Sequence, residues 1–203
     1  GDGRVFVATN SGVLTLRGES LERVESRNDR ARASAVTLLS DREGQLWVGT
    51  TEEGLHLLLL GRGVRFLRSS GESFRSIDID RAGVHWVSNE RRVLRFTTDA
   101  LGRPTSVGEA RFSGFDGLTV YATTEDSAGS LLFAMDGGVA RASAATRRTE
   151  SPAAEPDPRF DALRDRLVTA LFTDPQRVVW AVSPLGVFRL RSGESEAQPL
   201  ALP

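Results

Sequence analysis

Short apolar and β-branched runs, separated by polar turns, follow one another along the whole chain. Runs such as "AVTLLS" at 35–40 and "QLWVGT" at 45–50 are too short for helices and are bounded by Asp and Gly. Several are continuous rather than alternating, which is typical of strands covered on both faces. Only "RFDALRDRLVTAL" at 159–171 has a helical period, and we interpret its first half as a loop or single helical turn before a strand at 168. The pattern predicts an all-β protein.

The same unit recurs five times in order. Its central aromatic or apolar position falls at Phe6, Trp47, Trp86, Leu132 and Trp180, so the spacings are 41, 39, 46 and 48 residues. Such a period is typical of four-stranded β-propeller blades. The copies are "DGRVFVATNSGVLTL" at 2–16, "DREGQLWVGTTEEGLHL" at 41–57, "DRAGVHWVSNERRVLRF" at 80–96, "DSAGSLLFAMDGGVARA" at 126–142 and "DPQRVVWAVSPLGVFRL" at 174–190.

Each unit predicts one antiparallel blade within a single propeller domain over residues 1–203. The approximate units are 1–34, 35–73, 74–119, 120–167 and 168–203. The first unit starts at its second strand, which leaves open a five-bladed ring with imperfect closure or part of a larger ring. The segments 97–110 and 149–158 interrupt the pattern, and we interpret both as insertions. "QPLALP" at 198–203 is interpreted as the outer strand of the last blade.

Two positions that recur between the units, an aspartate and a tryptophan, have structural interpretations. An Asp-x-x-Gly turn suits a tight hairpin, because the carboxylate binds nearby backbone N–H groups and glycine adopts positive φ without strain. The large rings of the tryptophan column fill the space between adjacent blades. We therefore expect turn-capping from the aspartates and packing from the tryptophans, rather than calcium binding or sugar stacking; they are Asp41, Asp80, Asp126, Asp174, Trp47, Trp86 and Trp180.

Composition and motifs narrow the range of possible functions and partners. The 203 residues carry 26 basic and 27 acidic side chains, a net charge of −1, so no nucleic-acid partner is indicated. The longest apolar run, "LHLLLL" at 55–60, is far below the ~20 residues of a membrane helix, so we expect no membrane insertion. With no cysteine and only His56 and His85, neither a metal site nor a cofactor is predicted, and no nucleophile or phosphate-binding motif occurs.

The stretch "VTLLSDREGQLWVGTTEEGL" at 36–55 resembles the consensus of the two-component regulator propeller repeat family. "FDGLTVYATTEDSAGSLLFAMDGGVAR" at 115–141 adds the Asp-Gly-Leu lead-in of that repeat. The resemblance extends over nearly the whole chain, although Phe6, Leu132 and Arg177 depart from it. It implies an extracytoplasmic, periplasmic sensor propeller of a bacterial signalling protein that binds ligands such as oligosaccharides.

Candidate ligand-binding residues lie in the turns between second and third strands, which escape the repeat and are predicted to surround the central channel. Their mixed chemistry suits a polar small molecule or oligosaccharide. We predict a non-catalytic sensor; the alternatives are a protein-interaction scaffold and, with less support because no histidine lies in these turns, a propeller lyase or lactonase. The candidates are Asn10, Ser11, Thr51, Glu52, Glu53, Asn89, Arg91, Arg92, Asp136 and Ser183.

Overall fold

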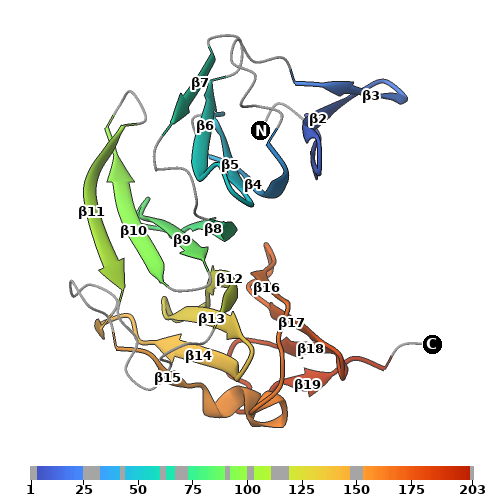
Figure 1. The fold of residues 1–203 in the computed structure, drawn as a ribbon. Coiled ribbons are helices and arrows are strands. Elements are labelled where there is room, and N and C mark those ends of the chain that lie inside the picture. Colours follow the sequence, from blue (N-terminus) through green and yellow to red (C-terminus); the bar gives the residue numbers. More distant parts are fainter. Residues whose placement is uncertain are drawn as a thin grey trace. The chain divides into compact units, whose positions relative to one another are not determined.

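The structure, a computed structural model, describes most of the chain as short antiparallel strands (Figure 1). The turns between strands carry the Gly and Asp residues from which they were expected, and a short 3-10 helix precedes the last sheet. The described residues are 4–24, 33–41, 44–59, 63–66, 73–89, 92–99, 103–110, 119–146 and 153–201.

The strands form five sheets, which we call blades 1 to 5 in chain order. Blade 1 contains β1 (Phe6–Thr9), β2 (Gly12–Arg17) and β3 (Ser20–Arg23). Blade 2 contains β4 (Ala35–Ser40), β5 (Leu46–Thr50), β6 (Leu55–Leu59) and β7 (Gly63–Phe66). Blade 3 contains β8 (Phe74–Ile79), β9 (His85–Asn89), β10 (Val93–Thr98) and β11 (Pro104–Ala110).

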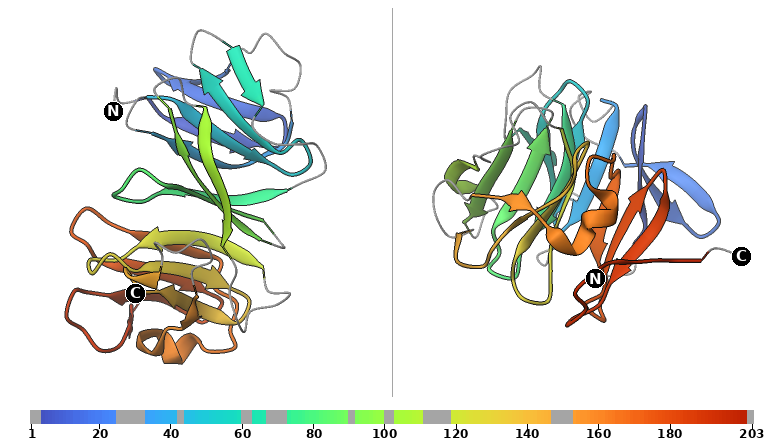
Figure 2. Two further views of the ribbon diagram at one scale, coloured as in Figure 1. Left: turned by 90° about the vertical axis from the view of Figure 1, so that its left-hand side faces the viewer. Right: turned by 90° about the horizontal axis from the view of Figure 1, so that it is seen from below.

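The last two blades lie on either side of the short helix (Figure 2). Blade 4 contains β12 (Val120–Glu125), β13 (Leu131–Met135), β14 (Gly138–Ala142) and β15 (Glu155–Pro156). The 3-10 helix η3 (Pro158–Leu163) follows. Blade 5 contains β16 (Ala170–Thr173), β17 (Val179–Ser183), β18 (Gly186–Leu190) and β19 (Gln198–Pro199).

The predicted all-β class and the propeller-type blades are confirmed. Blades 2 to 5 each contain four strands in sequential order, and among the described residues blade 1 contains three. Blade 1 begins with β1, which carries Phe6 at the tryptophan position, as the sequence predicted. The expected helical turn is η3, and the strand expected at 168 begins at Ala170.

Both predicted insertions prove to contain outer strands, which corrects their interpretation. Residues 104–110 form β11, the fourth strand of blade 3, and residues 155–156 form β15, the fourth strand of blade 4. β15 contains Pro156, which an edge strand tolerates because it needs no ladder N–H on its free side. Proline and polar residues hid these strands from a reading based on apolar runs.

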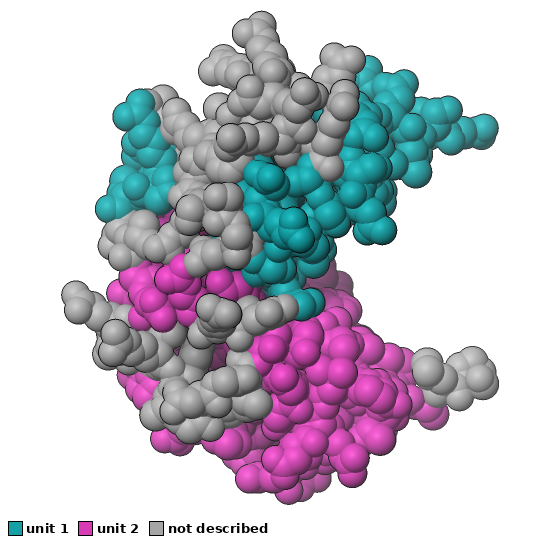
Figure 3. Space-filling model, viewed as in Figure 1, with its two compact units in different colours: residues 1–77, 98–105 teal, residues 78–97, 106–203 magenta. Residues whose placement is uncertain are grey.

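Two compact units divide the chain (Figure 3). Unit 1 comprises residues 1–77 and 98–105, and unit 2 comprises residues 78–97 and 106–203. Blades 1 and 2 therefore belong to unit 1, and blades 4 and 5 with most of blade 3 belong to unit 2.

Each unit has its own apolar core. In unit 1, Val13 of blade 1 packs with Leu46, Val48 and Leu58 of blade 2. In unit 2, Trp86 of blade 3 is 1% exposed and packs with blade 4 residues. A second cluster in unit 2 joins blade 4 to blade 5 and to the two buried residues of η3, which are Phe160 and Leu163.

Candidate functional site

The aspartate turns of blades 2 to 5, which read Asp-x-x-Gly in blades 2 to 4 and Asp-x-x-Arg in blade 5, share one hydrogen-bond pattern. In blade 3 the Asp80 N–H donates to the Val84 carbonyl (3.0 Å), and Gly83 N–H donates back to the Asp80 carbonyl (3.0 Å). The Asp80 Oδ1 atom then accepts from the Val84 N–H at 3.0 Å. Asp41, Asp126 and Asp174 make the same side-chain bond to the residue four positions on. The aspartates are turn caps, as predicted.

The second carboxylate oxygen links each turn to the tryptophan column. Trp47, Trp86 and Trp180 donate their indole Nε1–H to the Oδ2 atom of the aspartate six residues earlier, at 2.9, 3.0 and 2.9 Å. In blade 5 this bond lowers the pKa of Asp174 below its ordinary value. The packing role predicted for the tryptophans is confirmed for Trp47 and Trp86, which are 0% and 1% exposed.

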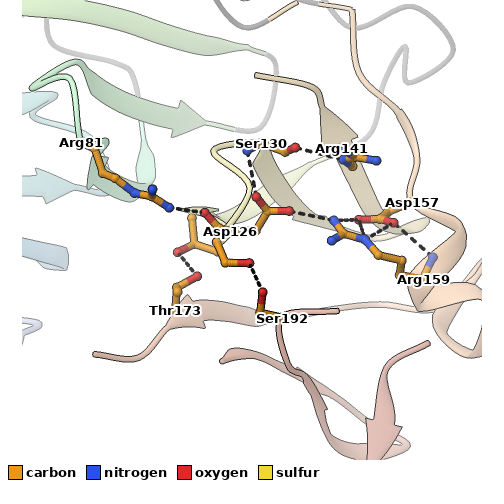
Figure 4. Close-up of polar contacts among 10 residues, drawn as sticks. Arg81, Asp126, Ser130, Arg141, Asp157, Arg159, Thr173 and Ser192 are labelled. Atoms are coloured by element: carbon orange, nitrogen blue, oxygen red, sulfur yellow. Dashed lines mark hydrogen bonds and ion pairs between the residues drawn. The ribbon is translucent and has the colours of Figure 1, made fainter. Parts of the chain in front are cut away.

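Blade 4 has Leu132 in the tryptophan column, so the second carboxylate oxygen of Asp126 receives its hydrogen bond from another donor (Figure 4). Arg159 of η3 donates from Nη2 to the Oδ2 atom of Asp126 at 2.9 Å. The same guanidinium donates from Nε and Nη2 to Asp157 at 3.0 and 2.7 Å. Burial opposes the charge of Arg159, but the bonds to Asp157 and Asp126 raise its pKa above the ordinary value.

Blade 5 departs from the turn at one position. Gly44, Gly83 and Gly129 have φ of 76°, 80° and 79°, and Arg177 adopts the same left-handed conformation with φ of 66°. Its N–H still donates to the Asp174 carbonyl at 2.9 Å. The turn thus forms with arginine, although the Cβ atom of a residue other than glycine makes the left-handed backbone conformation sterically unfavourable.

The candidate ligand residues of unit 1 lie at the ends of two tight hairpins. Asn10 and Ser11 are exposed between β1 and β2, where Thr9 Oγ1 donates to the Gly12 carbonyl at 2.7 Å. Between β5 and β6, Thr50 Oγ1 donates to the Gly54 carbonyl at 2.8 Å and accepts from the Glu53 N–H at 3.0 Å.

Thr51 and Glu52 are exposed at the tip of that second hairpin, and Glu53 is half-buried. The carbonyl of Glu53 contacts His56 Nε2 at 3.0 Å, so the backbone of this turn is held from within the sheet. Unit 1 therefore presents polar side chains from two turns whose backbones are hydrogen-bonded.

Two candidates of unit 2 are bonded to their own turns, and two others are bonded to neighbouring segments. Asn89 is buried and its Oδ1 accepts from the Arg92 N–H at 2.9 Å, and Ser183 Oγ accepts from the Leu185 N–H at 3.1 Å. Asp136 Oδ1 accepts from the Thr119 N–H at 2.8 Å.

Arg92 forms an ion pair with Glu109 at 3.8 Å, and Arg91 lies outside the described residues. The side chains of Asn89 and Ser183 hold their own turns in shape, a use that the repeat pattern alone did not reveal.

Sequence reasoning missed a charged cluster where blade 3 meets blade 4. Arg81 donates its backbone N–H to Glu125 Oε2 at 2.8 Å and pairs through Nε with Oε1 at 3.2 Å. Its Nη2 donates to the Asp126 carbonyl at 2.5 Å. Asp78, at the end of β8, accepts the Ile79 N–H at 2.9 Å.

Burial raises the pKa of Asp78 to about 7; the Ile79 bond opposes this rise, and the charges of Asp80 and Glu125 add to it. The sequence signal was present, because Asp78 occupies the column that holds Leu39, Thr124 and Phe172 in other blades.

Both histidines lie inside sheets. His56 is 2% exposed, and His85 is 4% exposed with its ring stacked on Phe96 at 4.8 Å. Over the residues that the structure describes, no group of three His, Cys, Asp or Glu side chains is placed to hold a metal ion. No helix in the described ranges has the length and apolar character needed to cross a membrane.

A hollow in unit 1 lies between blade 1 and blade 2, and most of its lining is apolar. Its two polar side chains, Thr50 and His56, already bond to the backbone of the β5–β6 turn. It offers little to orient a polar ligand. The lining residues are Val13, Val24, Ala33, Val48, Thr50, His56 and Leu58.

Blade 5 has one apolar face that is less covered than its counterparts. Phe172 is 51% exposed and stacks on Trp180, with ring centroids 6.4 Å apart. The register places Val182 and Val187 on the same face. Leu200 lies beside them, and its N–H donates to the Val187 carbonyl at 2.7 Å. Trp180 is only half-buried here, whereas the corresponding tryptophans of blades 2 and 3 are buried.

Comparisons with known structures find a similar fold in extracellular domains of signalling systems and in a lyase. No family model and no curated protein matches the sequence. The extracellular domain of BT4673 from B. thetaiotaomicron, attributed to a one-component system, matches 95% of this chain and 26% of its own, with 16% identity and a TM-score of 0.75. The extracellular domain of BT3049 from the same organism, attributed to a hybrid two-component system, gives 98%, 27%, 14% and 0.74.

An enzyme is equally similar in fold. A streptogramin B lyase matches 100% of this chain and 67% of its own length, at 16% identity and a TM-score of 0.73. The chain spans about a quarter of the length of the two extracellular domains. At these identities the likeness shows the fold alone.

Proposed function

We propose that this chain is a non-catalytic, ligand-binding propeller segment of a bacterial signalling protein, located outside the cytoplasm. Its ligand is a polar small molecule or oligosaccharide. The observation that carries the proposal is the pair of hydrogen-bonded hairpins in unit 1, which present the exposed Asn10, Ser11, Thr51 and Glu52. Exposed polar side chains on a rigid turn bind with little ordering cost. The likeness to two extracellular domains of signalling systems supports this reading.

The placement of the histidines argues against the enzymatic alternative. A lyase or lactonase needs an acid–base group or metal ligands that converge where substrate can reach. His56 and His85 are both buried within strands. The likeness to a lyase is a likeness of fold, and among the described residues no group of three His, Cys, Asp or Glu side chains is placed to hold a metal ion.

A second candidate function, protein interaction, is favoured by the blade 5 face around Phe172 and Trp180. Exposed aromatic side chains are enriched where proteins bind one another. Binding of a polypeptide would protect these residues and leave the hairpins of unit 1 unaffected.

A thermal-shift screen against oligosaccharides and polar metabolites tests the main proposal. A ligand at 100 times its Kd adds about 2.7 kcal/mol to the stability of the state that binds it. We expect at least one compound to raise the Tm, and the variants Asn10→Ala and Glu52→Gln to weaken that shift.

Glu155→Gln is the matched control, because Glu155 is an exposed carboxylate on the outer strand of blade 4. If the ligand raises the Tm of both hairpin variants as much as that of the unsubstituted protein, these hairpins are excluded as the binding site. Turnover of the compound would support the enzymatic alternative instead.

A further inference from the structure

One contact between successive blades recurs in the chain. Phe6, in the tryptophan column of blade 1, packs in the same apolar cluster as Leu46 and Val48, which lie on either side of Trp47 in β5 of blade 2. Because side chains alternate along a strand, these two neighbours of Trp47 point toward blade 1 and Trp47 points away from it. The column residue of one blade thus packs on the two residues that flank the column of the next. We call this contact a blade joint.

The blades of unit 2 are connected by the same blade joint. Trp86 of blade 3 clusters with the two residues that flank Leu132 in β13, and Leu132 clusters with the two residues that flank Trp180 in β17. The flanking residues are Leu131, Phe133, Val179 and Ala181. Both units are therefore built by placing a column residue of one blade on an aliphatic or aromatic pair of the next.

The column side of blade 5 is an open apolar face. Leu171 and Ala181 belong to the cluster with blade 4, so their strand neighbours Phe172 and Trp180 point to the opposite side of the sheet. Phe172 is 51% exposed and Trp180 is half-buried, whereas the column residue Trp86 is 1% exposed in its blade joint. The blade 5 face comprises Phe172, Trp180, Val182, Val187 and Leu200.

Blade 1 carries the other half of a blade joint. Val5 and Val7 flank Phe6, which packs on blade 2, so both valines point away from blade 2. The Val5 carbonyl accepts from the Leu16 N–H at 3.0 Å, and Leu16 pairs with Leu21 on β3. Val5, Leu16 and Leu21 are 51%, 41% and 54% exposed. The blade 1 face comprises Val5, Val7, Leu14, Leu16 and Leu21.

We propose that the blade 5 face of one copy of this chain packs on the blade 1 face of a second copy, which repeats between chains the blade joint made within each unit. Trp180 then meets Val5 and Val7, an aliphatic pair at the same register as Leu46 and Val48 of blade 2. A second copy necessarily carries this pair. The inference rests on the second candidate function, which assigns protein binding to the blade 5 face, and is independent of the ligand hairpins in unit 1.

The arginine on the blade 5 side of this contact is compatible with it. Arg189 lies opposite Trp180 on β18. Arg95 and Arg141 hold the same register position in blades 3 and 4, where the blade joints are formed. An arginine can cover apolar surface with its aliphatic stem and keep its charge at the rim. The blade 5 face therefore resembles the column faces that are already covered.

The proposed contact joins two different faces, which determines how copies assemble. A pair of copies joined in this way keeps one free blade 5 face and one free blade 1 face. Head-to-tail contacts of this kind close into a ring or continue from copy to copy. We expect the mean mass of the unsubstituted protein to rise with its concentration.

Sedimentation velocity of the whole chain at increasing concentration measures this association. Phe172→Glu places a charge in the blade 5 face, and Val5→Glu places one in the blade 1 face. Each should weaken self-association by about 30-fold or more, the loss typical of an interface hot spot. Val36→Glu is the matched control and should keep the association, because Val36 is 40% exposed on β4 of blade 2, outside both faces. Far-UV circular dichroism checks that each variant is folded.

Mixing the two face variants tests the pairing itself. Phe172→Glu keeps its blade 1 face and Val5→Glu keeps its blade 5 face, so the mixture should form a dimer that neither variant forms alone. In the unsubstituted protein, the quenching of Trp180 by iodide should decrease as the concentration rises, because association covers its indole ring.

The outcomes that contradict the proposal separate it from the second candidate function. A monomer at every concentration overturns the contact with a second copy, and binding of another polypeptide to the blade 5 face can still be measured. Self-association that survives Phe172→Glu excludes the blade 5 face as the contact and counts against the second candidate function as well. Association of Val5→Glu alone, or a mixture without a dimer, excludes the blade 1 face as the partner.

Discussion

Blade 3 and blade 4 build the same turn with different donors. In blade 3 the second oxygen of Asp80 is bound by the indole of Trp86 from the adjacent strand of the same blade. In blade 4 the corresponding oxygen of Asp126 is bound by Arg159, which lies 33 residues further along the chain in η3. In both turns a donor binds the second oxygen of a buried carboxylate, and the comparison shows that this donor can come from the adjacent strand or from a segment outside the repeat.

The two solutions differ in charge and therefore in what their loss costs. The indole is neutral and also fills the core, whereas the cationic Arg159 pairs with two buried carboxylates, Asp126 and Asp157, that are 1% and 3% exposed. Removing one partner of a buried ion pair leaves an uncompensated charge. Blade 4 should consequently be more sensitive to its donor than blade 3.

The largest expected effect is that of Arg159→Ala. It leaves two buried carboxylates without their cation and should lower the free energy of unfolding by about 3–5 kcal/mol. Urea denaturation followed by far-UV circular dichroism measures the loss. Arg164→Ala, which removes an exposed pair with Asp161, is the control and should cost no more than about 0.5 kcal/mol. Equal losses in both variants would show that the η3 ion pairs do not stabilise blade 4.

Trp86→Phe should have an intermediate effect in blade 3. The ring is retained in part, but the buried Asp80 loses its indole donor, which should cost about 2–3 kcal/mol for the unmet bond and lost volume together. The same denaturation experiment measures it. Trp180→Phe in blade 5 is the comparison, because Trp180 is half-buried and water can replace its bond to Asp174. A larger loss for Trp180→Phe would contradict the role of burial.

Arg177→Gly should give the smallest change and the opposite sign. Glycine relieves the left-handed backbone at φ of 66°, so we expect stabilisation by about 0.5–1 kcal/mol after the extra freedom of the unfolded chain is subtracted. Gly83→Ala in blade 3 is the reciprocal change and should destabilise by about 1 kcal/mol. Destabilisation by Arg177→Gly would indicate that the arginine side chain contributes more than its backbone costs.

The repeat made much of this fold predictable. The turn aspartates and column tryptophans recur at one spacing and meet within one hairpin, so a local pattern describes them fully. The role of Arg159 could not be derived in this way, because no spacing connects it to Asp126 and the connection exists only after blade 4 has folded. The outer strands β11 and β15 were hidden because short edge strands need few apolar residues.

The candidate site was predicted less well for a related reason. Asn89 and Ser183 are used inside their own turns, as short polar side chains after a strand often are, and turn chemistry could have signalled this. Asp78 could have been identified from the alignment of the five units, since a carboxylate beside the tryptophan column is out of place there. Which residues of unit 1 contact a ligand stays a prediction.

The division of the tryptophans between the two units gives the protein an internal set of optical reporters. Trp47 belongs to unit 1, and Trp86 and Trp180 belong to unit 2. Replacing Trp86 and Trp180 with phenylalanine leaves emission from unit 1 alone, and replacing Trp47 leaves emission from unit 2 alone, so the red shift of the remaining emission follows the exposure of one unit during unfolding. Iodide should quench half-buried Trp180 in the native protein and spare the other two. The unfolding of each unit can thus be followed separately without attaching a label.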